Sequence, residues 1–357
     1  MILADLDREL AARIARLVAD GTLPPEAARI APGRTWHAAP DGYPASFATS
    51  VSFELAALAD REPADIAVRL AAPLAQLPWV AAAERTGGGY LTITVTPRAL
   101  AEAAVRLARA ELGAAASTIL AGTTTTVRPW PDPAAAPSWR CAWQEHAEAM
   151  TGRLAQMAGA SVTDTMRAER QTHRADVAPA RQPSVADAVS WFGAPSLRYA
   201  LARATPRQVS QLGTTLRPGA PGAERQSVVR QAHASAVSTL RWAAELRLDV
   251  ADPGERCAEL LRSPAEQTLL GMLPWLPVRV AAAAARRRPD ELPAFLEAVA
   301  AGWLAAWQAA PALPFGGQAA PADPATAGAR LMLATAVTAV LASGLALTGA
   351  PVCAGDD

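Results

Sequence analysis

The sequence predicts a mainly α protein with a small N-terminal α+β domain, a reduced α/β linker region and a C-terminal all-α helix bundle. Three observations lead to this expectation. The chain has 357 residues, more than one hydrophobic core usually serves. Strand-like alternation is strongest at 90–95, and helical periodicity continues almost throughout from Val185. We expect the three parts to span 1–112, 113–190 and 191–357.

The N-terminal part is expected to open with an amphipathic helix from Ile2 to Leu17, where apolar residues recur at helical spacing. Further helices are expected from Ala48 to Ala59, from Pro63 onward and from Ala99 to Leu112. Proline in the first turn of a helix costs no hydrogen bond. Tyr90 to Val95 follows three glycines and alternates apolar with polar side chains, which predicts a turn into a strand.

The middle part contains a β-prone run from Thr123 to Val127, a helical segment from Arg140 to Met157 and polar sequence from Thr163 to Ser184. Near the end of the chain, Leu331 to Ala354 carries no charged residue and is long enough to cross a bilayer. Its abundant Ala, Thr, Gly and Ser favour a buried terminal helix over a membrane span.

Composition excludes several chemistries. The 33 basic residues balance 33 acidic ones, so no global positive field attracts nucleic acid. All 33 are Arg, because the chain has no Lys, and it has no Asn either. A P-loop lysine, a Schiff-base lysine and a KMSKS-type loop are therefore absent in their usual form. This bias is typical of a GC-rich genome, from which we expect a bacterial origin.

The cysteines and the N-terminus indicate the compartment. Cys141, Cys257 and Cys353 match no metal-ligand spacing and leave one thiol unpaired under any disulfide scheme. Acidic residues lie within the first nine positions, where a secretory signal needs a basic and then an apolar run. We therefore expect a cytoplasmic protein that needs no metal and no cofactor and has no membrane partner.

Four ordered segments of the last third carry a recognisable pattern: 193–201, 229–234, 292–307 and 329–349. The first, Gly-Ala-Pro-Ser-Leu-Arg-Tyr-Ala-Leu, resembles the G-x-D-A-L-R-Y segment of the DALR anticodon-binding domain of arginyl-tRNA synthetases. The second, Val-Arg-Gln-Ala-His-Ala, looks like the V-Q-Y-A-H-A stretch of that domain's next helix. The last two are similar to the family's Y-L-x-x-L-A-x-x-F-x-x-F-Y and A-R-L-x-L helices. The resemblance implies an anticodon-binding helix bundle.

Two N-terminal segments resemble the same family. Ser-Phe-Ala-Thr-Ser-Val at 46–51 is similar to the D-Y-A-T-N-V of the synthetases' additional N-terminal domain, and Gly-Gly-Gly-Tyr-Leu-Thr-Ile at 87–93 is similar to its G-P-G-F-I-N-I strand. In complete enzymes this domain meets the tRNA elbow. The resemblance therefore implies a second tRNA-binding region, in which Phe47 and Ser50 are candidates for RNA contact.

The middle part resembles only a fragment of the catalytic domain. Residues 150–162 are similar to the family's D-A-L-A-R-L-L-E-A-A-G-x-V, which implies that 123–162 is a remnant of the first strand and helix of the class I nucleotide-binding fold. After Val162 only about thirty residues remain before the helical part, and each βαβ unit needs roughly thirty or more. Counting back, the H-x-G-H signature falls on four positions with neither histidine: Ser138, Trp139, Arg140 and Cys141. We expect a degenerate ATP site and no catalytic residue.

The resemblance and side-chain chemistry together give ten RNA-binding candidates: Phe47, Ser50, Arg198, Tyr199, His233, Arg286, Arg287, Arg288, Trp303 and Trp307. Each has a structural alternative. A tyrosine usually buries its ring, and a lone helical histidine is more often packed or simply exposed. The two tryptophans share one helix face, which is either a stacking platform or core. The arginine run follows an alanine-rich helix end, where it interacts favourably with the helix dipole.

The chain also departs from the family pattern. Pro195 and Ser196 replace Asp-Ala, and Ser227, Val228 and Gln231 stand where the family has tyrosines. The leading hypothesis is a non-catalytic, arginyl-tRNA synthetase-like pseudoenzyme, a tRNA-binding or regulatory module of translation with tRNA, arginine-specific tRNA included, as partner. Two alternatives stay open. One is a protein–protein interaction module that docks on a genuine synthetase or another partner, and the other is an arginine–tRNA ligase with residual activity.

Overall fold

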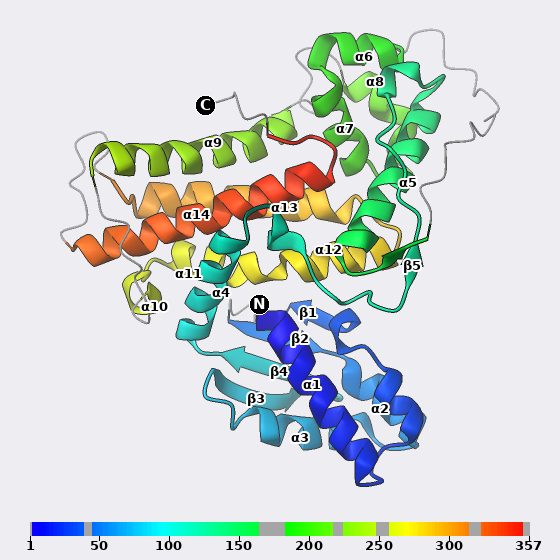
Figure 1. Ribbon diagram of the computed structural model, residues 1–357, viewed down its shortest axis with the longest axis vertical. Coiled ribbons are helices and arrows are strands. Elements are labelled where there is room, and N and C mark those ends of the chain that lie inside the picture. Colours follow the sequence, from blue (N-terminus) through cyan, green and yellow to red (C-terminus); the bar gives the residue numbers. More distant parts are fainter. Residues whose placement is uncertain are drawn as a thin grey trace.

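The protein is mainly α, as the sequence predicts (Figure 1). The computed structural model describes residues 2–38, 45–163, 183–216, 224–247, 257–313 and 323–352. A lower body contains a sheet with helices on it, and an upper body consists almost entirely of helices (Figure 1). Most of the polar sequence from Thr163 to Ser184 lies outside the described residues, as does Cys353.

The N-terminal part folds around a four-stranded antiparallel sheet in the order β1-β2-β4-β3. Phe47, Leu91, Ile93 and Val95 are buried in one core with the apolar stripe of the first helix. The elements up to the end of this part are α1 (Ile2–Ala19), β1 (Trp36–Ala38), β2 (Ser46–Thr49), α2 (Val51–Ala59), α3 (Pro63–Leu74), β3 (Val80–Thr86), β4 (Tyr90–Val95) and α4 (Pro97–Ala110).

The structure corrects one expected boundary and adds three strands. Ala48 and Thr49 were expected to be helical, but they pair with Thr92 and Leu91 of β4, and α2 begins only at Val51. Cross-strand hydrogen bonds here outweigh local helix preference. Strands β1, β2 and β3 were not expected at all. The expected helices at the N-terminus and from Pro63, and the strand β4, are confirmed.

The middle part forms one βαβ unit. Its elements are β5 (Thr124–Thr125), α5 (Trp139–Met157) and β6 (Ser161–Val162), and the two strands pair in parallel. Ser138 caps the start of α5, since its hydroxyl accepts a hydrogen bond from the backbone N of Cys141 at 3.2 Å. Gly152 allows close packing, since a Cβ there would lie 2.2 Å from the backbone O of Thr126.

The upper body is a helix bundle around α14, most of which is buried. Gly344 of α14 packs directly against the Leu296 side chain of α13. The helices of this part are α6 (Val185–Phe192), α7 (Ala194–Arg203), α8 (Leu212–Thr215), α9 (Glu224–Glu245), α10 (Cys257–Leu260), α11 (Pro264–Met272), α12 (Leu276–Ala285), α13 (Glu291–Ala309) and α14 (Pro324–Leu347).

Two stretches are long and apolar enough to cross a membrane, Pro264–Ala285 and Pro324–Leu347. In each, 72% of the most apolar window is buried inside the fold, and core helices of soluble proteins pass the same test of length and composition. The second stretch is the segment for which the sequence favours a buried terminal helix.

The N-terminal part and the bundle are joined by packing. Phe47 of β2 lies 5.4 Å, centroid to centroid, from Trp275, which belongs with Val278 to the N-terminal core. Helix α4 serves both cores, because Leu100 is buried in the N-terminal core and Leu107 in that of the bundle. The domain limits at residues 112 and 190 therefore stay a prediction.

Candidate RNA-binding residues and degenerate nucleotide site

The four positions of the H-x-G-H signature lie at the start of α5, and apolar packing covers that turn. Trp139 is buried, and its Nε1 donates a hydrogen bond to the carbonyl O of Pro183 at 2.9 Å. Trp139 shares a cluster with Val185 of α6 and Leu197 of α7. Cys141 is buried as well, while Arg140 is exposed. The side chains at this helix start thus serve packing.

The parallel sheet beside α5 is small. Each of its strands has two residues, and among the described residues no further strand joins them. Parallel sheets that bind ligands at their carboxyl edge normally have several strands covered by helices on both faces. The described residues therefore form only a fragment of such a sheet.

Three aromatic candidates are buried: Phe47 is 0% exposed, Tyr199 1% and Trp303 3%. The hydroxyl of Tyr199 donates to the carbonyl O of Pro293 at 3.4 Å, and Nε1 of Trp303 donates to Oγ of Ser235 at 2.7 Å. Buried rings with satisfied polar groups offer no face to an RNA base. For these three residues a packing role replaces the expected RNA contact.

Four further candidates are partly or largely covered. Ser50 lies at the start of α2, and its Oγ is 3.3 Å from Nε2 of His37. Arg198 donates from Nη2 to the carbonyl O of Pro131 at 3.2 Å, which ties α7 to the loop before α5. His233 is buried, and Trp307 is half-buried against the bundle core. Of the four, Ser50, Arg198 and Trp307 keep part of their surface in solvent.

The arginine run that follows α12 is exposed. Arg286 forms an ion pair with Glu291 at 3.4 Å, and Arg288 forms a two-point contact with Asp290 at 2.9 and 2.8 Å. Arg287 has no acidic partner among the described residues. It adopts a left-handed backbone conformation with φ of 54°. These are the best-exposed of the ten candidates.

Positive charge gathers where the N-terminal part meets the bundle, a feature that the sequence does not reveal. Burial lowers the pKa of His37 in β1, and the positive charges of Arg286 and Arg279 lower it further. Burial also lowers the pKa of Arg279, whose guanidinium lies 5.4 Å from the ring centroid of Trp275. Such a site favours an anion. No local motif predicts it, because folding brings together β1 and α12 from opposite halves of the chain.

A second basic cluster lies between α5 and α7. The ring of Trp130 stacks on His146 with centroids 5.1 Å apart, and Arg153 lies 4.2 Å from the Trp130 centroid. Burial lowers the pKa of His146 to about 3, and the charge of Arg198 contributes to this shift. His146 is therefore neutral near pH 7.

Among the residues that the structure describes, no group of three or more His, Cys, Asp or Glu side chains could hold a metal ion.

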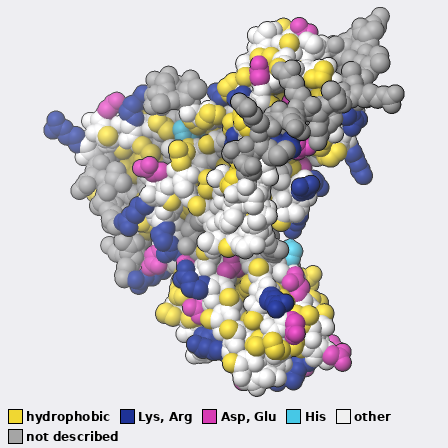
Figure 2. Space-filling model, turned by 45° about the vertical axis from the view of Figure 1, so that its right-hand side comes forward, with side chains coloured by type: hydrophobic (Ala, Val, Ile, Leu, Met, Phe, Trp, Pro, Cys, Tyr) yellow, Lys and Arg dark blue, Asp and Glu magenta, His cyan; other side chains and the backbone are white. Residues whose placement is uncertain are grey.

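On the face drawn in Figure 2, arginine side chains are interspersed with acidic ones over both bodies. A continuous basic stripe is not visible on that face.

Comparison with known proteins identifies the bundle. Residues 229–354 match the DALR anticodon binding domain. The chain is 34% identical over 166 residues to the arginine–tRNA ligase of Micrococcus luteus, and 35% identical over 163 residues to that of Frankia alni. Each match covers 46% of this chain and 29% of the relative. Thermus thermophilus arginyl-tRNA synthetase shows 20% identity and a TM-score of 0.34, covering 65% of this chain and 40% of that one.

The matched residues make the C-terminal part of the chain similar to the DALR anticodon binding domain. More particularly, the chain is related to arginyl-tRNA synthetases, as the sequence motifs predict. The match spans less than a third of the length of the two ligases. Similarity over that length does not assign the complete enzymes' activity to this chain.

Proposed function

We propose that the protein is a non-catalytic relative of arginyl-tRNA synthetases that binds tRNA, as a binding or regulatory module of translation in the cytoplasm. The match of residues 229–354 to the DALR anticodon binding domain carries this proposal. The matched segment includes α9 to α14, which pack around one core with α4.

The state of α5 supports the non-catalytic part of the proposal. Adenylate formation needs charge stabilisation on the phosphates of ATP, and the two signature histidines that supply it in the family are here Ser138 and Cys141. Trp139 and the apolar side chains of α6 and α7 cover the helix start. A nucleotide lying along this turn would have to displace them.

Exposed cations at the junction of the two bodies support phosphate contact. The guanidiniums of Arg279 and Arg286 lie close enough to His37 to lower its pKa, so two positive charges from the α12 region lie near β1, and Glu291 pairs with one of them, Arg286. Contacts of this kind fix a protein on the RNA backbone without reading its sequence. We therefore expect tRNA binding to depend steeply on salt concentration.

An electrophoretic mobility shift with total tRNA at low salt tests binding. Arg286→Ala removes one phosphate contact, which should weaken binding and reduce the salt slope by about 1. Arg98→Ala is the matched control, since Arg98 is 54% exposed and paired with Glu102, whereas Arg286 is 52% exposed and paired with Glu291. No shift of tRNA by the unmodified chain contradicts the proposal, and equal effects of the two variants remove Arg286 from it.

Exposed apolar side chains favour a second candidate function, a protein–protein interaction module. Trp242 of α9 is 42% exposed, and Leu246 is 57% exposed in the turn that follows, where its backbone N donates to the O of Trp242 at 2.9 Å. Mixing the chain with a genuine arginyl-tRNA synthetase and running size exclusion after nuclease treatment separates the two functions. A complex that survives the nuclease is not bridged by RNA and supports docking.

Residual arginine–tRNA ligase activity is the third hypothesis. Arginine-dependent exchange of pyrophosphate into ATP measures adenylate formation directly. We expect no exchange above background, because the signature positions are occupied by Ser138, Trp139, Arg140 and Cys141. Exchange that requires both arginine and the purified chain contradicts the non-catalytic proposal while leaving tRNA binding intact.

A further inference from the structure

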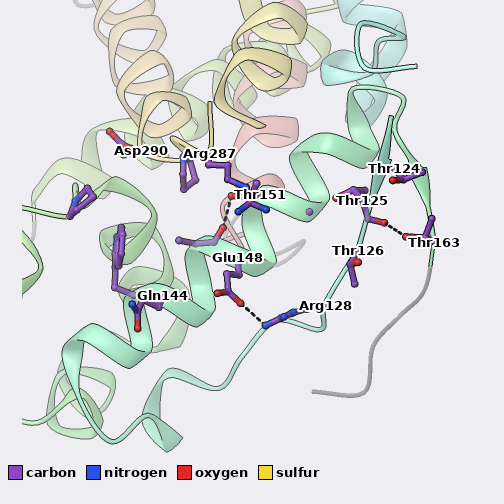
Figure 3. A pocket seen from close by; sticks show the side chains of 15 residues that line it. Thr124, Thr125, Thr126, Arg128, Gln144, Glu148, Thr151, Thr163, Arg287 and Asp290 are labelled. Carbon is purple, nitrogen blue, oxygen red and sulfur yellow. Dashed lines mark hydrogen bonds and ion pairs between the residues drawn. The ribbon is translucent and has the colours of Figure 1, made fainter. Parts of the chain in front are cut away.

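A groove of about 550 Å³ lies along the outer side of α5, between that helix, strand β5 and the turn that joins α12 to α13 (Figure 3). Its volume falls within the range of pockets that bind small molecules. Its lining includes none of the positions 138–141, so it is separate from the start of α5 where the signature falls.

The two arginines and two acidic residues that line the groove balance, and Arg288 beside it adds one positive charge. Arg128 and Glu148, both in its lining, form an ion pair (Figure 3). Asp290 is neutralised by Arg288. Arg287 also lines the groove and has no acidic partner among the described residues. One uncompensated guanidinium suits a ligand with a single phosphate better than a di- or triphosphate.

The backbone holds Arg287 at a position where glycine is usual. Helix α12 ends with hydrogen bonds from the N of Arg288 to the O of Ala283, at 2.9 Å, and from the N of Arg287 to the O of Ala284, at 3.1 Å. In this type of helix end the left-handed residue is most often glycine, because a Cβ is unfavourable there. The chain therefore keeps a strained arginine side chain at the rim of the groove.

Hydroxyl groups line the rest of the groove. Oγ1 of Thr151 donates to the carbonyl O of Ala147 at 2.7 Å, which leaves its lone pairs for a ligand donor. Thr126, on the chain that leaves β5, has no side-chain partner among the described residues. In the view of Figure 3, Arg287 lies near Thr151, and Thr126 lies across α5 from it. Trp143 adds an aromatic wall, held by its Nε1 hydrogen bond to the O of Ala204 at 2.9 Å.

We propose that this groove binds one nucleoside monophosphate unit, either as a free nucleotide or as the phosphorylated end of an RNA. The phosphate lies on Arg287, the ribose hydroxyls meet the threonine side chains, and the base lies toward Trp143. Charge, hydroxyls and an aromatic surface are the three features that such a ligand requires.

Isothermal titration of the full chain with adenosine monophosphate tests the proposal, with adenosine and inorganic phosphate as separate probes. We expect the monophosphate to bind at least tenfold more tightly than either fragment. Arg287→Gly should weaken this binding at least tenfold while the melting temperature stays equal or rises, because glycine relieves the left-handed strain. The neighbouring Arg286→Ala, which lies outside the groove lining, should leave monophosphate binding unchanged.

A second variant tests whether the effect of Arg287→Gly on binding comes only from a change in the turn between α12 and α13. Thr151→Val keeps the shape of the side chain and removes the hydroxyl, so it should weaken binding severalfold. A short RNA with and without a 5′ phosphate distinguishes the two sources: binding that needs the terminal phosphate and Arg287 supports an RNA end. The proposal is overturned if neither the monophosphate nor the phosphorylated RNA binds, or if both bind Arg287→Gly as well as the unmodified chain. The tRNA proposal is tested at Arg286 and the groove proposal at Arg287. A failure of monophosphate binding therefore does not contradict tRNA binding.

Discussion

The two sheets of this protein are held in different ways. The four-stranded antiparallel sheet buries Phe47, Leu91 and Ile93 against the helices of its own part of the chain. The two-stranded parallel sheet has Ser161 and Val162 exposed, and its helix α5 buries Met150 and Leu154 in the core of the bundle. The first sheet is supported mainly by neighbouring sequence, with Trp275 and Val278 of the bundle joining its core, whereas the second depends on helices that come later in the chain.

This difference shows what a small parallel sheet needs in order to persist. Two short strands with one helix bury too little apolar surface to be stable by themselves. Here α12 and α7 provide the surface that a larger parallel sheet would otherwise offer to α5. The middle part should therefore lose its structure whenever the bundle does, and the N-terminal sheet should be less affected.

The largest expected effect comes from breaking a buried ion pair of the bundle. Glu266 of α11 is 1% exposed and accepts a hydrogen bond from Nε of Arg330 of α14 at 2.7 Å. Arg330→Ala leaves this carboxylate unpaired and should cost about 3–5 kcal/mol of unfolding free energy. Hydrogen exchange should show that the amides of α5 lose protection together with those of α14, while those of β4 retain more. An equal loss of amide protection in β4 would contradict the claim that the two sheets depend on different parts of the chain.

A pair of glycine substitutions tests the contact between α5 and β5. Gly152→Ala places a Cβ 2.2 Å from the backbone O of Thr126, and the overpacking should cost about 3 kcal/mol. Gly302→Ala in α13 is the control, since its Cβ would meet Leu269 at an ordinary 3.5 Å. It should stabilise the bundle by up to about 1 kcal/mol through helix propensity. Urea unfolding measures the unfolding free energy of both variants. An unchanged unfolding free energy for Gly152→Ala would show that the strand does not need this close approach.

His146 makes the middle part sensitive to acid. Its pKa is lowered to about 3 in the folded protein, with burial as the main cause, against an ordinary value of 6.5. Below pH 6.5 the unfolded chain takes up a proton that the folded chain does not, so stability falls as pH falls. Between pH 6.5 and 5 the loss should be about 2 kcal/mol. His146→Phe keeps a ring on Trp130 and should flatten this dependence, and an unchanged pH profile would place its cause elsewhere.

Asp7 gives the N-terminal part a smaller dependence of opposite sign. Burial raises its pKa from 3.8 to about 6, although a hydrogen bond from Nε1 of Trp36 lowers it in part. The folded protein then holds a proton that the unfolded chain has lost, so stability falls as pH rises toward 6. The loss between pH 5 and 7 should be about 1 kcal/mol, and Asp7→Asn should abolish it. Melting temperatures across this range measure the effect, and a rise in stability with pH that Asp7→Asn leaves in place would contradict it.

The sequence predicts those elements whose own residues repeat with a clear period. Helix α1 and strand β4 show this, since each buries its own apolar stripe. Strand β3 was missed, because Val-Ala-Ala-Ala-Glu-Arg-Thr has neither alternation nor strong β preference, and pairing with β4 decides its conformation. The helix start expected at Ala48 failed for the same reason.

For the candidate site, residue type could be predicted but exposure could not. Phe47, Tyr199 and Trp303 are aromatic residues at family positions, and in this fold each is buried by partners distant in the sequence. The grouping of His37 with Arg279 arises only when β1 meets α12. The sequence singles out Arg287 only as one member of an arginine run. That it has no acidic partner among the described residues depends on how Arg286 and Arg288 pair with Glu291 and Asp290.

Fluorescence anisotropy of labelled tRNA, titrated with the chain at several salt concentrations, tests the central claim most directly. We predict saturable binding at low salt, with an affinity that falls linearly on a double-logarithmic salt plot and is unchanged by ATP and arginine. No binding at the lowest salt concentration, or an affinity that ATP and arginine together increase, would contradict a non-catalytic tRNA-binding protein.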